Sequence, residues 1–314
     1  MWKKAFLFPG QGSQEVGMGK DLFENNDPFF RSLIDLGSEI TGCNLEKLCL
    51  NGPESQLIQA RYLQPLLVAV SLGYFNRLTD RGIVPDVVLG HSLGEITSLA
   101  AATIVDPEQA VRIAARRGEL MDMVAQKNDG GMLAIMFMDL DSVIELLEEI
   151  NEPDRVVLAN DNAPCQVVLS GEMKLLDKIS FEIQNRKLGK TRIVNVIGPW
   201  HSPFLAEARD VYTKWAEDII FKEPQIPVIF NALAKPHKDP STIKNLVAGQ
   251  LSMPVYWRES METLRQAGVN TFFEIGPGRV LTGLVRANGF KKGITVHSIN
   301  NLDSIEKLCE LKTV

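Results

Sequence analysis

The feature that most constrains this chain is a very tight turn between a β-branched run and a helix-forming run. The run 84–89 ends at Gly90, the sequence 95–102 favours a helix, and Gly-x-Ser-x-Gly lies between them with Ser92 at its centre. Side chains two positions before and after the serine would collide with neighbouring backbone, so only Gly90 and Gly94 fit. The pattern predicts a nucleophile elbow, with Ser92 at the positive N-terminal end of a helix. A glycine-rich turn without catalytic function is the alternative.

A nucleophilic serine needs a base, and the chain offers four histidines. His91 lies inside the elbow, where its side chain must point away from Ser92. His237 lies in a polar loop, and His297 alternates with apolar residues as in a strand. His201 follows a Gly-Pro break ahead of a helix, so by elimination it is the best placed to take a proton from the serine.

Length and composition limit the classes of protein to which this chain can belong. Its 314 residues suffice for one large domain with an insertion or for two domains, and 45% hydrophobic with 23% charged residues is ordinary for a globular protein. The net charge of −6 argues against a nucleic-acid binder. Four cysteines without a CxxC pair indicate reduced thiols in a cytoplasmic protein and no metal site. No run resembles a signal peptide or a membrane span.

The order of the predicted elements indicates an α/β fold with a second, inserted unit. In the larger part we expect strands over 4–8, 225–230 and 271–275, helices over 27–42, 53–60, 62–78 and 106–126, and a loop over 251–257. Between them we expect strands over 132–138, 156–159, 166–170 and 191–196, with helices over 140–150 and 172–185. This βαββαβ order is that of a ferredoxin-like domain. We therefore expect an insertion over 129–197 within a catalytic domain formed by 1–128 and 198–314.

Three further polar features could belong to a reaction centre. The glycine-rich loop 8–14 lacks the lysine of a Walker loop and the third glycine of a dinucleotide fingerprint, so we expect it to bring backbone N–H groups and Gln11 close to the site. Gln64 precedes a buried helix, where it either satisfies loop backbone or belongs to the site. Arg116 and Arg117 are adjacent on a helix and point in different directions, so at most one faces a buried site. Two solvated arginines are the alternative.

Six motifs together resemble the malonyl-CoA:acyl carrier protein transacylases, a family that includes the stand-alone acyltransferases of polyketide synthases. They lie at 8–14, 64–65, 90–95, 117–121, 201–202 and 274–278. They follow the family's order and spacing from the first strand to about residue 287, which is nearly all of the chain. The resemblance implies a hydrolase-like parallel-sheet domain with an inserted ferredoxin-like small domain and an active site between them.

The resemblance also implies a ping-pong reaction. Ser92 would be acylated by malonyl-CoA and then attacked by the phosphopantetheine thiol of a holo acyl carrier protein, without a permanently bound cofactor. His201 would take the serine proton and return it to the departing thiolate. The backbone N–H groups of Gln11 and Leu93 would form the oxyanion hole, and the backbone carbonyl of Gln250 would orient the imidazole.

Substrate choice follows from other positions that the resemblance implies. Arg117 would pair with the malonyl carboxylate, Gln64 would help to hold that site, and Arg116 would remain in solvent. The chain departs from the family at Ile96, where an aromatic residue is common, at Trp200, where relatives carry a small or phenylalanyl residue, and at Met253, where an asparagine is frequent. Trp200 either narrows the pocket in favour of malonyl over methylmalonyl groups or signals a different acyl group.

Two other functions use the same sequence features. A proofreading hydrolase acting on acyl carrier protein thioesters would share the serine and histidine, but it would have no use for Arg117 on simple acyl chains. A non-catalytic scaffold subunit is not favoured, because Ser92 and His201 are both present. We expect a cytoplasmic monomer that binds neither nucleic acid nor membrane. A basic surface for the acidic carrier protein would come from Arg186, Lys187, Lys190 and Arg192, with Arg286, Lys291 and Lys292 as further candidates.

Overall fold

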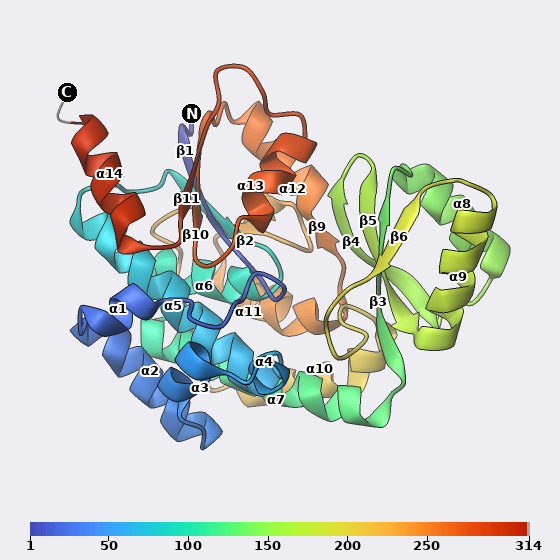
Figure 1. Ribbon diagram of the computed structural model, residues 1–314, viewed down its shortest axis with the longest axis horizontal. Helices are drawn as coiled ribbons and strands as arrows, with labels where there is room; N and C mark the ends of the chain where they lie inside the picture. Colours follow the sequence, from blue (N-terminus) through green and yellow to red (C-terminus); the bar gives the residue numbers. More distant parts are fainter. Residues whose placement is uncertain (313–314) are drawn as a thin grey trace.

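Four parallel strands form the central sheet of the larger part of the molecule (Figure 1). The computed structural model describes residues 1–312. The sheet order is β11-β10-β1-β2, formed by β1 (Lys4–Phe8), β2 (Val87–Gly90), β10 (Thr271–Ile275) and β11 (Thr295–Ile299). Strands β1, β2 and β10 are almost wholly buried, as expected for parallel strands covered by helices on both faces.

Helices cover this sheet and carry most of the core. The N-terminal ones are α1 (Lys20–Glu24), α2 (Pro28–Thr41), α3 (Leu45–Asn51), α4 (Glu54–Leu57), α5 (Ala60–Asp80), α6 (Leu93–Ala101) and α7 (Pro107–Lys127). The C-terminal ones are α10 (Ala206–Ala216), α11 (Pro240–Gly249), α12 (Trp257–Gln266), α13 (Val280–Ala287) and α14 (Leu302–Lys312). Helix α5 is buried on nearly all sides and packs along α7. Helix α6 packs against both of these long helices.

A second sheet lies to one side of the molecule, in green and yellow in Figure 1. It contains β3 (Gly130–Met136), β4 (Val156–Ala163), β5 (Gln166–Glu172) and β6 (Lys190–Ile193), with α8 (Leu140–Ile150) and α9 (Met173–Asn185). Its order, β6-β3-β5-β4, with antiparallel neighbours, is the ferredoxin-like arrangement. The predicted fold class is therefore confirmed, while the domain bounds at 128/129 and 197/198 stay a prediction.

The helix expected over 53–60 shortens to α4, the strand expected over 191–196 ends at Ile193, and two other segments differ more. The strand expected over 225–230 is wrong for most of its length, because only β7 (Ile229–Phe230) pairs, with β8 (Lys235–Pro236). Pro227 has no N–H to give a ladder, and Val228 makes only an isolated bridge to Val88. The loop expected over 251–257 instead contains the end of the 3₁₀ helix η2 (Gln250–Ser252) and the strand β9 (Val255–Tyr256). Strand β9 pairs in parallel with β4 and adds a fifth strand to the second sheet.

The first prediction concerns Gly94, one of the two elbow glycines. A Cβ added at Gly94 would lie 2.0 Å from the backbone oxygen of Phe8, whereas a Cβ added at Gly283 in α13 meets nothing within 4 Å. Gly94→Ala should therefore destabilise the protein by more than about 4 kcal/mol, because backbone must move. Gly283→Ala, the matched control, should stabilise it by about 0.5–1 kcal/mol. Thermal unfolding of both variants measures this, and an unchanged Tm for Gly94→Ala would contradict it.

Candidate active site

The elbow has the strand–turn–helix context that the sequence predicts. Ser92 lies between β2 and α6 with φ 52° and ψ −109°, a left-handed conformation that costs energy for a residue with a Cβ. A Cβ on Gly90 would lie 1.8 Å from the carbonyl carbon of Gly94. The turn is therefore possible only with these glycines, and it places the Ser92 hydroxyl ahead of the first turn of α6.

His201 is the histidine that meets Ser92. Its Nε2 lies 2.7 Å from Ser92 Oγ, and its Nδ1 faces the backbone oxygens of Gln250 and Met253 at 3.0 and 2.9 Å. Because a carbonyl only accepts, Nδ1 carries the proton and Nε2 presents its lone pair to the serine. The contact with the Gln250 carbonyl was predicted, whereas that with Met253 was not.

The surroundings keep His201 uncharged. The imidazole is 3% exposed, and its pKa is lowered to about 3, chiefly by burial and then by the positive charge of Arg117. A neutral imidazole at physiological pH has its Nε2 lone pair free. His201 therefore has the protonation state and the geometry of a general base.

His91 points away from the serine, as its place in the elbow predicts. Its Nε2 lies 2.8 Å from Asn162 Oδ1 on β4, and its ring packs against Trp257. His91 thereby joins the elbow to the second sheet, and it makes no contact with the Ser92 hydroxyl.

Arg117 is the arginine that faces the site. It is 1% exposed, and Nη1 donates to Gln64 Oε1 at 3.0 Å while Nη2 donates to Ser92 Oγ at 3.2 Å. Burial lowers its pKa to about 10, so it stays protonated at neutral pH. Arg116 points elsewhere and pairs with Glu119 at 2.6 Å.

The two backbone N–H groups predicted for the oxyanion hole have no acceptors among residues 1–312. The N–H of Leu93 is the first of α6, and that of Gln11 lies in the loop after β1. A Cβ on Gly10 would lie 2.4 Å from the His91 oxygen, so this loop packs directly on the elbow. Gln64 Nε2 donates to Gln11 Oε1 at 2.9 Å and ties the loop to α5.

The remaining predicted positions, Ile96 and Trp200, are buried. Ile96 is fully buried in the core on α6. The Trp200 ring is 3% exposed and packs back against Gly198 and near Ala125, and its Nε1 has no partner among residues 1–312. Sequence analysis missed Glu95 and Asn231, which are buried and hydrogen-bonded to the elbow.

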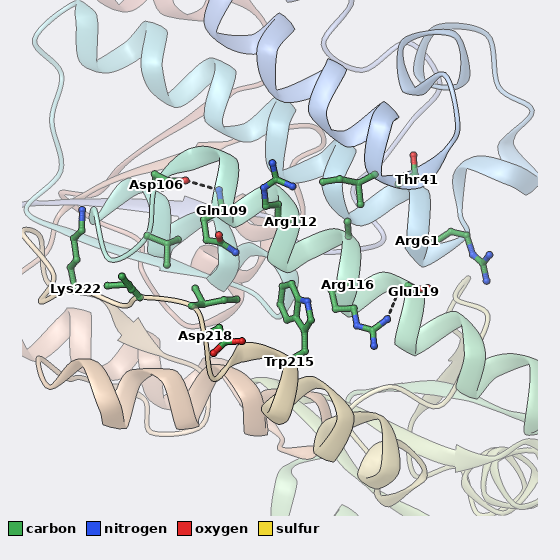
Figure 2. Close-up of a pocket in the computed structure, with 15 residues that line it drawn as sticks. Thr41, Arg61, Asp106, Gln109, Arg112, Arg116, Glu119, Trp215, Asp218 and Lys222 are labelled. Atoms are coloured by element: carbon green, nitrogen blue, oxygen red, sulfur yellow. Dashed lines mark hydrogen bonds and ion pairs between the residues drawn. The ribbon is translucent and has the colours of Figure 1, made fainter.

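A cavity of about 880 Å³ lies elsewhere, between α7, α10 and the end of α2 (Figure 2). Arg112, Arg116 and Trp215 line it, whereas Ser92, His201 and Arg117 do not. Arg116 and Arg117 therefore face different sides of α7, one toward this cavity and one toward the serine. Within the described part of the chain, no group of three or more His, Cys, Asp or Glu residues could hold a metal ion. None of the described helices has both the length and the hydrophobicity needed to cross a membrane.

Comparison with known proteins places this site in a family. The sequence model of the acyl transferase domain family matches residues 5–304 of this chain. The chain belongs to the acyl transferase family.

Three known proteins are similar to this chain over most of its length. The malonyl CoA-acyl carrier protein transacylase PksC of Bacillus subtilis is 38% identical over 283 residues, which cover 89% of this chain and 95% of the relative. The crystal structure of a malonyl CoA-acyl carrier protein transacylase from Clostridium perfringens has a TM-score of 0.90 at 31% identity, covering 99% of this chain and 98% of that one. A malonyl-transacylase in complex with its type II polyketide synthase acyl carrier protein has a TM-score of 0.91 at 31% identity, covering 98% and 99% of the two chains.

The position of Arg117 generates the second prediction. Its charge helps to lower the pKa of His201, so Arg117→Ala should raise that pKa toward the ordinary value of 6.5. Arg116→Ala is the matched control and should leave it unchanged. Titration of the His201 ring nitrogens by ¹⁵N NMR measures the shift. An equal rise in both variants, or none in Arg117→Ala, would contradict this account of the site's electrostatics.

Proposed function

We propose that this acyl transferase moves a malonyl group from malonyl-CoA to the phosphopantetheine thiol of an acyl carrier protein, for fatty acid or polyketide synthesis. Similar proteins carry that activity in their names, and one of them was solved with its carrier protein. A cytoplasmic location and a monomeric state stay part of this proposal.

The buried guanidinium of Arg117 is the observation that carries the malonyl assignment. It forms no ion pair with a described residue, and its Nε has no hydrogen-bond partner among them. An unpaired buried cation is costly, and a carboxylate is the anion whose two oxygens match a guanidinium fork. Arg117 also donates to Ser92 Oγ, so a carboxylate bound there would lie next to the nucleophile. An acyl group with a free carboxylate, such as malonyl, meets these conditions.

The first half-reaction forms a serine ester. Ser92 Oγ attacks the thioester carbonyl as its proton passes to His201 Nε2. The developing oxyanion would accept hydrogen bonds from the backbone N–H groups of Gln11 and Leu93, an effect worth roughly 3–4 kcal/mol per donor in comparable sites. The C–S bond then breaks, and His201 gives its proton to the departing coenzyme A thiolate.

The second half-reaction runs the same steps in reverse order. The carrier thiol loses its proton to His201 and attacks the ester, the ester C–O bond breaks, and Ser92 recovers the proton. One thioester replaces another, so the exchange is nearly neutral in free energy. No external driving reaction is required.

The third prediction concerns the acyl group. Incubation with malonyl-CoA should add one malonyl group to the intact mass, Ser92→Ala should abolish the adduct, and holo carrier protein should remove it. Arg117→Ala should lower kcat/KM for malonyl-CoA by roughly a hundredfold, the loss of about 3 kcal/mol for a buried charge pair, and should affect acetyl-CoA far less. Arg116→Ala is the control and should match the wild type.

Other outcomes would point to another function. If malonyl-CoA leaves no adduct and loaded acyl carrier proteins are emptied into water, the protein is a hydrolase. An adduct with methylmalonyl-CoA equal to that with malonyl-CoA would contradict the predicted narrowing of the pocket by Trp200.

The fourth prediction concerns the carrier protein. Arg186 pairs with Glu149 and Glu182, which leaves Lys187, Lys190 and Arg192 as the more available cations of the predicted basic surface. Reversing Lys187 and Lys190 to Glu should raise the apparent KM for carrier protein at low salt and leave acylation by malonyl-CoA unchanged. Arg155→Glu, in the turn just before β4, is a control because Glu152 and Glu172 already pair with Arg155. Unchanged transfer kinetics in the double variant would rule out this surface.

A further inference from the structure

Glu95 is a buried carboxylate that the proposed reaction does not use. It lies on α6, three residues after Ser92, and only 1% of it is exposed. Both oxygens accept hydrogen bonds, Oε2 from the backbone N–H of Asn231 at 2.6 Å and Oε1 from the Gln250 side-chain amide at 2.9 Å. It forms no ion pair within residues 1–312. Burying a charge without a counter-ion costs free energy, so the carboxylate is expected to have a role. The two residues that bind it indicate what that role is.

One partner, Asn231, holds the nucleophile. Its Oδ1 accepts the backbone N–H of Ser92 at 2.7 Å, and its Nδ2 donates to the oxygen of Gly90 at 2.7 Å. The side chain thus spans the elbow and holds Ser92 in its left-handed conformation. It also removes the Ser92 N–H from the set of free donors, leaving those of Gln11 and Leu93.

The other partner, Gln250, holds the base. Its side-chain Nε2 donates to Glu95 Oε1 and to the backbone oxygen of Ser92 at 3.0 Å, while its own backbone oxygen faces Nδ1 of His201. Two acceptors fix the direction of this amide, because the opposite orientation would place oxygen against oxygen. Gln250 Oε1 is buried without a partner among the described residues, a cost accepted for that orientation.

We propose that Glu95 is a positioning residue that fixes Ser92 and His201 relative to each other, through Asn231 on one oxygen and Gln250 on the other, and that it does so only as the carboxylate. The two links start from one group and end on the two reacting side chains. Proton transfer between the serine and histidine depends on their separation, so loosening either link lowers the rate of acylation. This inference rests on the proposed serine chemistry, not on the identity of the acyl group.

The charge state of Glu95 gives the arrangement a pH dependence. Burial raises the pKa of Glu95 to about 7, offset by the Asn231 N–H, the Gln250 amide and the charge of Arg117. Protonation puts a hydrogen on an oxygen that already accepts an N–H and removes the negative charge, so at least one of the two links is weakened at low pH. Activity should therefore rise with pH as Glu95 ionises near pH 7.

The pKa values of the other titratable groups around Glu95 lie far from neutral pH or are shifted away from it. Arg117 on α7 has a pKa lowered to about 10, and burial raises the pKa of Tyr212 on α10. The pKa of His201 is lowered to about 3, and burial lowers that of His91. Glu95 is thus the group near the elbow whose pKa is raised to about neutral pH.

The test is the isosteric variant Glu95→Gln, with acylation followed by p-nitrophenyl acetate and by malonyl-CoA from pH 5 to 9. The activated ester needs the serine and the base but no carboxylate pocket. For both substrates kcat should fall by about 10- to 100-fold, as for a small misplacement of reacting groups, while KM for malonyl-CoA stays nearly constant. The rise near pH 7 seen in the wild type should be absent from Glu95→Gln.

Glu274→Gln is the matched control. Glu274 is another fully buried carboxylate, and it accepts the N–H groups of Leu281 and Thr282 at 2.9 and 2.7 Å at the start of α13. Its variant should lower Tm but keep the wild-type kcat and pH profile. If Glu95→Gln does not fold, Gln250→Met removes the same link and leaves the backbone carbonyl for His201. It should also lower kcat.

Two results would overturn the inference: a Glu95→Gln enzyme with wild-type kcat and pH profile, or the same loss in Glu274→Gln. If Glu95→Gln does not fold, a Gln250→Met enzyme with wild-type kcat would overturn the inference instead. A wild-type enzyme that is acylated by p-nitrophenyl acetate but not by malonyl-CoA would instead contradict the proposed substrate, and the comparison of variants would still decide the role of Glu95.

Discussion

The close approach of three backbone segments at the elbow is the constraint on which the rest of the site depends. Gly90 lies against Gly94, Gly94 lies against the end of β1, and Gly10 lies against His91. With no side chains between them, the loop after β1 packs directly on the elbow, as the proposed oxyanion hole formed by Gln11 and Leu93 requires. The same crowding forces Ser92 into a left-handed conformation, and the bonds of Asn231 hold it there. Strain and support are therefore parts of one arrangement.

The second physical theme is that a single buried cation affects two neighbours. Burial is the main reason why the base stays neutral, and Arg117 adds to it by disfavouring protonation of His201; the same guanidinium leaves an unmatched positive charge beside the nucleophile. Glu95 compensates part of this charge at a distance without pairing with it. A direct ion pair would have neutralised Arg117 and left it with no affinity for a carboxylate from outside. The separation between Arg117 and Glu95 therefore matters for function, because it leaves Arg117 able to bind a substrate carboxylate.

Local sequence patterns account for the parts of the fold and of the site that could be predicted. The elbow, the parallel strands and the βαββαβ segment rest on local periodicity and turn chemistry, and the structure has all three. Elimination among four histidines led to His201, whereas Arg117 followed only from the family resemblance. The contacts of Glu95 with Asn231 and Gln250 join residues more than 130 positions apart, and no local pattern reveals them. The strand over 225–230 was overestimated because apolar composition does not show which backbone groups find a partner.

Strand β9 gives the second sheet a mechanical link to the base. Only Pro254 separates β9 from Met253, whose carbonyl faces Nδ1 of His201, and β9 is paired with β4 of that sheet. Arg258, just beyond β9, pairs with Asp161 of β4 and reinforces the connection. A rigid-body tilt of the sheet would therefore pull on an acceptor of the imidazole proton through a single residue. The second sheet and an acceptor of the imidazole proton are thus joined by a few residues of chain, so a movement of that sheet would change the position of this acceptor.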